Sequence, residues 1–388
     1  MPTLPLGTAP AAARNEACPI CGGETEFLLQ LSFGKKSGLP ETPELRLCHG
    51  DDFAFITEAD QATYDAYYGA TVNDYCHEEV APGPDSPIAL QAQHLISLVP
   101  GNSLDGMRIL DFGCGRGTLL RLLAARYPAA SFTGYDPNPV AKEYKAGNLR
   151  LTTAPNTLDG PYDLIIMSHV LEHFVDFSCL ATASRLLSPD GALYVEVPDA
   201  ARYADYPRRS FLYYFDRIHI NHFSRTALQH LLGHHGFRET AYFTYDFPYT
   251  DGLRYPAMGM MLRKGMAAGT AGSALPDGLR RYVSQEQARA KTIMAPLRAH
   301  TRLLVWGSGD NFCRQMTNGG PLSLIETIVL LDKTPREISF GGQNYVSILP
   351  ETGLRQCKAP VIVTVSEASA SIVEQIHAID PERHYLLV

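Results

Sequence analysis

A glycine-rich loop follows a predicted buried strand in the segment RILDFGCGRGTLLRLL at residues 108–123. Its glycines, Gly113, Gly115 and Gly117, permit a sharp turn and a close approach to a ligand. Asp111 ends the strand, on the usual ligand side of an α/β sheet. Asp136 ends the next strand, 19 residues beyond Gly117, where its carboxylate can accept hydrogen bonds from both hydroxyls of a ribose. Because the spacing is not the Gly-x-Gly-x-x-Gly of a dinucleotide loop, the pattern predicts a nucleoside site, with a ligand-free glycine turn as the alternative.

Three cysteines near the N-terminus have metal-ligand spacing. Cys18-x-x-Cys21 followed by Cys48 offers three thiolates for a structural zinc. The spacing does not determine the fourth ligand. Histidine is the better zinc ligand, whereas a second Cys-x-x-Cys pair would place the ligand where this sequence has an aspartate. The candidates are His49, Asp51, Cys76 and His77. Three unrelated thiols and no metal are the alternative.

Histidines gather in the stretch FLYYFDRIHINHFSRTALQHLLGHHGF at 211–237. His219 and His222 lie in an aromatic loop just before a predicted helix, which places them near the carboxyl edge of the sheet. A neutral imidazole is suited to general acid–base catalysis, which contributes typically ~10²–10⁴-fold. For His222 alone, a structural hydrogen-bonding role stands beside the catalytic one.

The elements that position these residues alternate along the chain. From residue 107, strand-like and helical runs alternate, which predicts a parallel, doubly wound α/β sheet. Two strand-like runs at 241–247 and 258–264 predict an antiparallel edge. We divide the chain into an N-terminal region (1–85), this core (86–265), a linker helix (266–300) and a C-terminal Rossmann-like domain (301–388). In the last, Asp332 ends a strand after a Gly-Ser-Gly turn, which is only a weak sign of ligand binding.

Composition narrows the class of protein. The chain has 388 residues and a net charge of −8, which disfavours a nucleic-acid partner. No apolar run reaches the ~18–20 residues of a membrane-spanning helix, and the N-terminus does not resemble a secretory signal. We therefore expect a soluble, cytoplasmic protein with no membrane partner.

Three motifs together resemble a class I S-adenosylmethionine-dependent methyltransferase over roughly residues 87–265: the string DFGCGRG, the acidic end of the second strand, and YDLIIMSHVLEH. The resemblance implies S-adenosylmethionine as methyl donor. It places Asp111, Gly113 and Gly115 along the methionine portion of the donor and Asp136 at the ribose. Ser168 and His169 would lie near the donor.

The order of parts is similar to that of the zinc-containing nucleotide-sugar C-methyltransferases over nearly the whole chain. The similarity implies a zinc-binding N-terminal region and a small-molecule substrate, a nucleotide-linked keto sugar, in specialised or surface-sugar biosynthesis. His222 matches a catalytic histidine of that family and His173 a second one, while Tyr68 lies where the family has a tyrosine close to donor and substrate. The family's tyrosine and glutamate before His222 are here His219 and Asn221.

These two departures leave the reaction centre open. An amide such as Asn221 can donate a hydrogen bond but cannot ionise, so it cannot replace a glutamate as base. His222, His219 or His173 could take the proton instead. The alternatives are methylation of an oxygen or nitrogen of another natural-product intermediate, and a non-catalytic binding protein.

Overall fold

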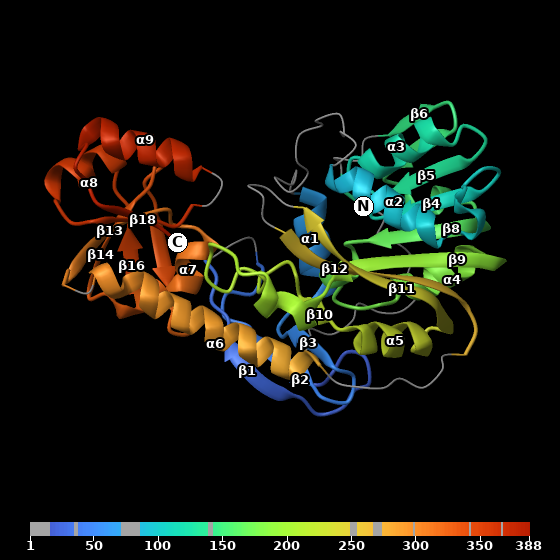
Figure 1. The fold of residues 1–388 in the computed structure, drawn as a ribbon, viewed down its shortest axis with the longest axis horizontal. Coiled ribbons are helices and arrows are strands. Elements are labelled where there is room, and N and C mark those ends of the chain that lie inside the picture. The colour runs from blue at the N-terminus through green and yellow to red at the C-terminus, as the bar shows by residue number, and fades with distance from the viewer. Residues whose placement is uncertain are drawn as a thin grey trace.

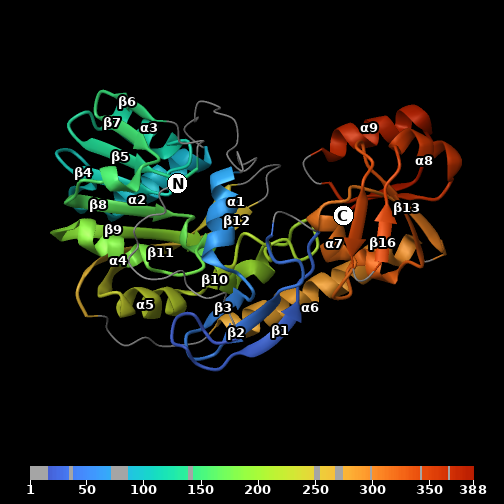
Figure 2. The same cartoon turned by 180° about the vertical axis from the view of Figure 1, so that it is seen from behind.

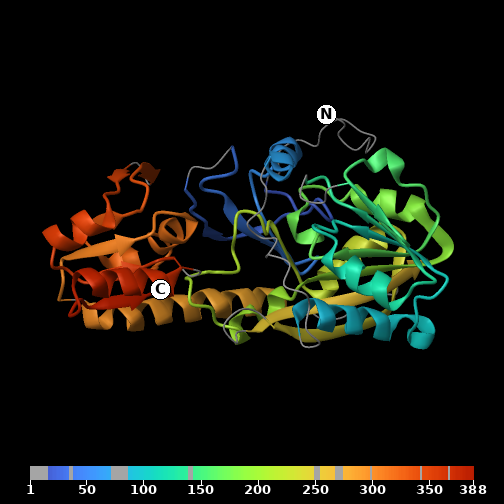
Figure 3. The same cartoon turned by 90° about the horizontal axis from the view of Figure 1, so that it is seen from above.

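The computed structural model describes residues 16–34, 38–70, 86–138, 143–248, 254–266, 274–297, 299–340, 343–365 and 368–388. Figure 1 shows a larger lobe, which ends near residue 266, and a smaller C-terminal lobe. They are joined by α6 (Leu275–Met294), which runs beneath both lobes in Figure 3.

The larger lobe contains an eight-stranded sheet in the order β11-β12-β9-β8-β4-β5-β7-β6 within the described residues. Its strands are β4 (Arg108–Phe112), β5 (Ser131–Tyr135), β6 (Tyr144–Ala146), β7 (Leu149–Thr152), β8 (Tyr162–Ser168), β9 (Leu187–Pro198), β11 (Phe237–Pro248) and β12 (Arg254–Lys264). The strands from β9 to β7 run parallel, whereas β12 and β11 are antiparallel at one edge. The parallel sheet and its antiparallel edge are both confirmed.

Different helices cover the two faces of this sheet. They are α2 (Pro87–Leu98) and α3 (Thr118–Arg126) on one face, and α4 (Cys179–Leu186) and α5 (Arg225–His234) on the other. Successive side chains of a strand point to opposite faces, so Leu164 packs with the first pair of helices and Ile165 with the second. No helix in the described ranges has the length and apolar character needed to cross a membrane.

One helix predicted from the sequence is corrected. The run PVAKEYKA at 139–146 reads as a helix, but its described part, Tyr144–Ala146, is strand β6. β6 pairs antiparallel with β7, from Tyr144 opposite Leu151 to Ala146 opposite Leu149. The hairpin forms because Gly147 adopts a positive φ of 56° in a two-residue turn. Residues 139–142 lie outside the described residues.

The last strand of the N-terminal sheet comes from a later part of the sequence, the core region at 86–265. It contains β1 (Glu26–Gln30), β2 (Glu44–Cys48), β3 (Phe53–Ile56) and β10 (Asn221–Phe223), in that order. β10 pairs with β3, with His222 opposite Ala54. Figure 2 shows β1 and β2 beside α6, where Arg280 contacts Glu26 at 2.8 Å. The next helix, α1 (Gln61–Ala70), carries Tyr68 to the edge of the central sheet.

The C-terminal lobe has a parallel sheet in the order β14-β13-β17-β18. Its elements are β13 (Arg302–Trp306), α7 (Asp310–Gln315), β14 (Thr327–Leu331), a hairpin of β15 (Glu337–Phe340) and β16 (Gln343–Val346), α8 (Pro350–Gln356), β17 (Val361–Val363), α9 (Ser369–Ile379) and β18 (Tyr385–Leu387). Trp306 is a buried core residue of this sheet.

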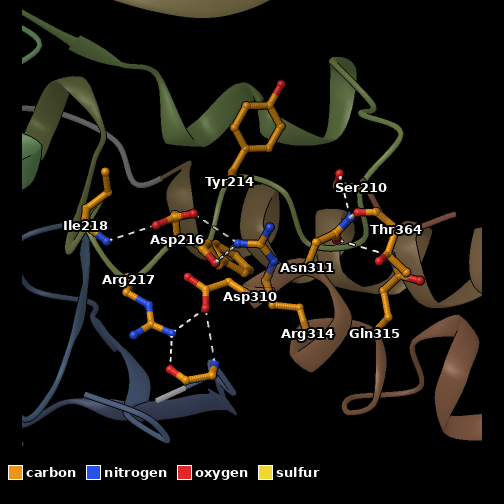
Figure 4. A network of polar contacts seen from close by, with 12 residues as sticks. Ser210, Tyr214, Asp216, Arg217, Ile218, Asp310, Asn311, Arg314, Gln315 and Thr364 are labelled. Atoms are coloured by element: carbon orange, nitrogen blue, oxygen red, sulfur yellow. Dashed lines mark hydrogen bonds and ion pairs between the residues drawn. The ribbon is translucent and has the colours of Figure 1, made fainter. Parts of the chain in front are cut away.

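Two crossed ion pairs attach the C-terminal lobe to the segment that precedes His219 (Figure 4). Arg217 pairs with Asp310 at 2.5 Å, and Arg314 pairs with Asp216 at 3.2 Å. The Arg217 side chain is 2% exposed, and a buried charge is tolerated only when it is paired. The C-terminal lobe therefore fixes the backbone from which His219 extends.

Candidate functional site

The glycine loop lies at the carboxyl ends of β4 and β5. Gly113, Gly115 and Gly117 have φ values of 91°, 52° and 73°, which favour glycine. A Cβ at Gly113 would lie 2.5 Å from Cγ2 of Val170. The backbone N–H groups of Gly113 and Cys114 both donate to the carbonyl of Tyr135, at 2.7 and 3.0 Å. The loop is thus held against the end of β5, in a shape that side chains would prevent.

Asp136 connects this loop to the N-terminal region. Its Oδ2 accepts from the Gly115 N–H at 2.8 Å, and its Oδ1 accepts from the Asn138 N–H at 2.9 Å. The side-chain amide of Asn138 donates to the carbonyl of Tyr68 at 2.8 Å. The structure therefore brings Tyr68 and Asp136 to one edge of the sheet.

Asp111 is a buried carboxylate on the same edge. Burial, with the charge of Asp136 as a second cause, raises the pKa of Asp111 to about 7. Within the part of the chain that the structure describes, no group donates a hydrogen bond to its carboxylate. A cationic partner would stabilise a buried carboxylate of this kind, because a nearby positive charge favours the ionised form of the carboxylate.

Ser168 and His169 end β8, but their side chains are already engaged. The Ser168 hydroxyl donates to Oε1 of the buried Glu196 at 2.9 Å, and Gln91 donates to the same oxygen at 2.8 Å. Nδ1 of His169 lies 3.1 Å from Glu172 Oε1, and its Nε2 lies 3.2 Å from Glu196 Oε1. Burial alone would lower the pKa of His169, but hydrogen bonds to both carboxylates outweigh it and raise the pKa to about 10. His169 is therefore a positively charged imidazolium held between Glu172 and Glu196.

Asn221, which stands where the resembled family has a glutamate, holds the turn that carries His173. Its Nδ2 donates to the carbonyls of Leu171 and Phe174, at 2.7 and 2.8 Å. These acceptors flank His173 in the short 3-10 helix η4 (Leu171–His173) and its C-cap. A carboxylate here would face two carbonyl oxygens, so the amide is the residue type that fits.

Tyr68, His173 and His219 are brought together. The rings of the two histidines lie 4.9 Å apart at 65°. Nδ1 of His173 lies 2.8 Å from the carbonyl oxygen of Ile218 and 3.0 Å from the Tyr68 hydroxyl. Because a carbonyl only accepts, Nδ1 carries the proton and the lone pair is on Nε2. Burial and the neighbouring His173 lower the pKa of His219 to about 4, so the His219 ring is neutral and can act as a base or a ligand.

His222 lies behind this pair, in the aromatic core. It is fully buried, with its ring 5.2 Å from Phe215 and 5.9 Å from Tyr203. Its Nδ1 lies 3.3 Å from the Tyr203 hydroxyl. Burial, followed by the effect of His219, lowers the pKa of His222 to about 3. The imidazole is neutral, but a substrate does not reach it in this arrangement.

A second cluster contains Cys18, Cys21, Cys48 and Asp51, with one ligand atom of each within 4.8 Å of the others. Cys18 Sγ lies 3.1 Å from Asp51 Oδ2, and Cys21 Sγ lies 3.8 Å from Cys48 Sγ. The other oxygen of Asp51 lies 3.1 Å from Nδ1 of His230 on α5. Three thiols and a carboxylate are a donor set that zinc accepts, and a histidine behind the carboxylate orients it.

His49 as the fourth ligand of this cluster is corrected. Its Nε2 lies 2.7 Å from Glu26 Oε2, and its side chain is 54% exposed. The chain turns back after β2, so the third residue after Cys48, not the next one, returns to the thiols. Cys76 and His77 lie outside the described residues.

Sequence reasoning missed several residues of the main site. These are Gln91, Asn138, Glu172 and Glu196. The two glutamates were detectable, because each is an acid placed in or beside the end of an apolar strand. Gln91 and Asn138 carried no such signal.

Comparisons with known proteins agree with this geometry. Residues 88–241 match a family model described as a methyltransferase domain. Trans-aconitate 2-methyltransferase of Streptomyces coelicolor is 34% identical over 117 residues, 27% of this chain and 39% of that protein. Biotin biosynthesis bifunctional protein BioCD of Bordetella avium is 38% identical over 97 residues, 23% of this chain and 21% of that protein. Magnesium protoporphyrin IX methyltransferase of Synechocystis PCC 6803, solved with bound S-adenosylmethionine, is 18% identical with a TM-score of 0.36, and the match covers 53% of this chain and 97% of that one.

Residues 88–241 are therefore similar in sequence to methyltransferase domains. The chain spans less than half the length of these curated relatives.

Proposed function

We propose that the chain is a methyltransferase that transfers the methyl group of S-adenosylmethionine to a small molecule. The observation that carries the proposal is the braced glycine loop between Asp111 and Asp136, within a domain that matches methyltransferases. Asp111 would face the ammonium group of the donor and Asp136 its ribose. The donor supplies an activated methyl group, so the protein needs to position the acceptor in line and accept a proton.

In this proposal, either His173 or His219 accepts the proton. Both rings are partly exposed, and the carbonyl of Ile218 fixes His173 with the Nε2 lone pair available. The Tyr68 hydroxyl beside them can donate a hydrogen bond to an acceptor oxygen. His222 would support the pair from the core.

The acceptor we propose is a nucleotide-linked keto sugar, methylated on carbon in specialised or surface-sugar biosynthesis. Support comes from the order of parts along the chain and from Tyr68 and His173 meeting at one site. Methylation of an oxygen is the second candidate, because Asn221 donates to backbone carbonyls where the resembled enzymes have a base. The test is incubation with S-adenosylmethionine and a thymidine-diphospho 4-keto deoxysugar, read by mass spectrometry. A product one methyl group heavier supports carbon methylation; no product with intact S-adenosylhomocysteine binding contradicts the keto-sugar assignment.

Donor affinity is expected to depend on pH through Asp111. The ammonium group of the donor pairs with the ionised carboxylate, whose pKa of about 7 is raised by burial. Lowering the pH from 8 to 6 protonates Asp111 in the free protein, so affinity should fall ~10-fold. Calorimetric titration with S-adenosylhomocysteine at several pH values measures this. Asp111→Asn should bind weakly with a flat pH profile, and an equally steep profile in that variant would assign the titration to another group.

We also propose a structural zinc at Cys18, Cys21, Cys48 and Asp51. The purified protein should carry about one zinc per chain, and Cys48→Ser should lose most of it, because a thiolate is removed from a four-ligand set. Metal analysis by plasma mass spectrometry makes the comparison. Cys357→Ser, in the C-terminal lobe, is the matched control and should keep the metal. Equal zinc in both variants would place the metal elsewhere.

A further inference from the structure

The loop that carries His219 and the turn that carries His173 meet over a buried acid. One carboxylate oxygen of Glu172 and one ring nitrogen each of His173 and His219 lie within 4.8 Å of one another. Glu172 is fully buried, whereas both histidines are partly exposed. The three ligand atoms are therefore close enough to converge on one point.

We infer that Glu172, His173 and His219 bind a divalent transition-metal ion. Two histidines and one carboxylate are the ligand set of catalytic zinc sites and of the facial triad that holds iron, with further positions left open. Atoms bound to one ion at ~2.2 Å are ~3.1 Å apart in a facial octahedral arrangement and ~3.6 Å apart in a tetrahedral one. The three ligand atoms lie within 4.8 Å of one another, so the imidazoles would have to close by ~1–2 Å to bind the ion.

The surroundings of the cluster favour an ion over an unmetallated triad. Oε1 of Glu172 is paired with His169, but Oε2 is buried and has no hydrogen-bond partner among the residues that the structure describes. An unpaired buried carboxylate oxygen is costly, and coordination to a cation would satisfy it. His173 donates its Nδ1–H to the Ile218 carbonyl at 2.8 Å, which is the outer hydrogen bond that metal-binding histidines usually make.

A metal ion at this cluster would also suit the proposed reaction. A bound ion would polarise a carbonyl or hydroxyl oxygen of the acceptor, a task that Asn221 does not perform because its amide donates to two backbone carbonyls. That use rests on the proposed function, whereas the metal site itself does not. A nitrogen that coordinates the ion cannot accept a proton at the same time, so the two roles of the histidines exclude each other at any moment.

The test compares zinc binding by the full-length wild type, His219→Tyr and His234→Tyr. Protein that already holds its thiolate-bound metal is titrated with Zn²⁺ by calorimetry, and with Co²⁺ by absorption spectroscopy. Wild type should bind one additional equivalent, with a Co²⁺ spectrum that lacks sulfur-to-metal charge transfer. His219→Tyr should bind this equivalent at least ~100-fold more weakly. His234 is an exposed histidine on α5, and its replacement should change nothing.

Glu172→Gln is the second variant and should also lose the additional equivalent. Circular dichroism and S-adenosylhomocysteine binding of the same samples show that each variant is folded. Equal binding by wild type and His219→Tyr, or only thiolate-type Co²⁺ spectra in wild type, would overturn the inference. Loss of methyl transfer with the additional metal still bound would count against the proposed function and not against this site.

Discussion

Replacing His173 by alanine is expected to lower turnover at least ~100-fold while changing the affinity for S-adenosylhomocysteine less than threefold. His173 lies between the Tyr68 hydroxyl and His219, and its Nε2 lone pair is oriented by the Ile218 carbonyl. It contacts neither the glycine loop nor Asp136 through a hydrogen bond in the described structure, so donor binding should persist. The prediction holds whether His173 takes a proton or holds a metal ion, because alanine removes both abilities.

The matched control is His222→Ala. That side chain is fully buried against Phe215 and Tyr203, so its loss should leave a core cavity and lower the melting temperature. Its effect on turnover should be smaller than that of His173→Ala at a temperature where both variants are folded. Stopped-assay mass spectrometry with a working acceptor gives the rates, and thermal unfolding gives the stabilities. Loss of turnover in a folded His222→Ala, with His173→Ala active, would place the proton acceptor on the buried side.

The arrangement of the glycine loop, Asp111 and Asp136 could be predicted because its signals are local. The strand that ends in Asp111, the glycines and the acid Asp136 follow one another within 30 residues, and neighbouring parallel strands bring their carboxyl ends to one edge. The structure adds what a linear pattern does not contain: the Asp136 carboxylate accepts hydrogen bonds from the backbone of the loop itself.

The positions of His219, Asn221 and His222 could not be predicted to the same depth. They depend on the pairing of two strands that are distant in the sequence. β10 has only three residues, and nothing in NHF indicates that it completes a sheet begun by Phe53–Ile56. That pairing sends His222 into the core and leaves His219 partly exposed, although the two residues are only three positions apart. The direction of the Asn221 amide, toward two carbonyls, follows from the same pairing.

The cluster of Cys18, Cys21, Cys48 and Asp51 shows a similar limit. Spacing alone could not choose between His49 and Asp51, since both follow Cys48 closely. The choice depends on the turn after β2 and on His230, which lies on a helix of the central fold and contacts Asp51. A side chain that is oriented from another part of the fold, as Asp51 is by His230, leaves no local pattern in the sequence.

Asp136→Ala is expected to weaken S-adenosylhomocysteine binding ~10–100-fold. The carboxylate accepts hydrogen bonds from Gly115 and Asn138, at 2.8 and 2.9 Å, and would also accept from the ribose. A hydrogen bond to a charged group contributes ~1.5–3 kcal/mol, and each ~1.4 kcal/mol is a factor of ten in affinity. Alanine removes the ribose acceptor and also releases the glycine loop, so both effects act in the same direction.

Asp163→Ala is the control, because it removes a similar bond from the opposite end of the sheet. Oδ2 of Asp163 accepts from the backbone N–H of Arg108 at 2.9 Å, at the start of β4 and not at its carboxyl end. This variant should lose stability without losing donor affinity. Calorimetric titration of both variants, with thermal unfolding of the same samples, separates the two effects. Unchanged affinity in a folded Asp136→Ala would reduce Asp136 to a brace of the loop, and equal losses in both variants would show that affinity follows the stability of the sheet and not the ribose contact.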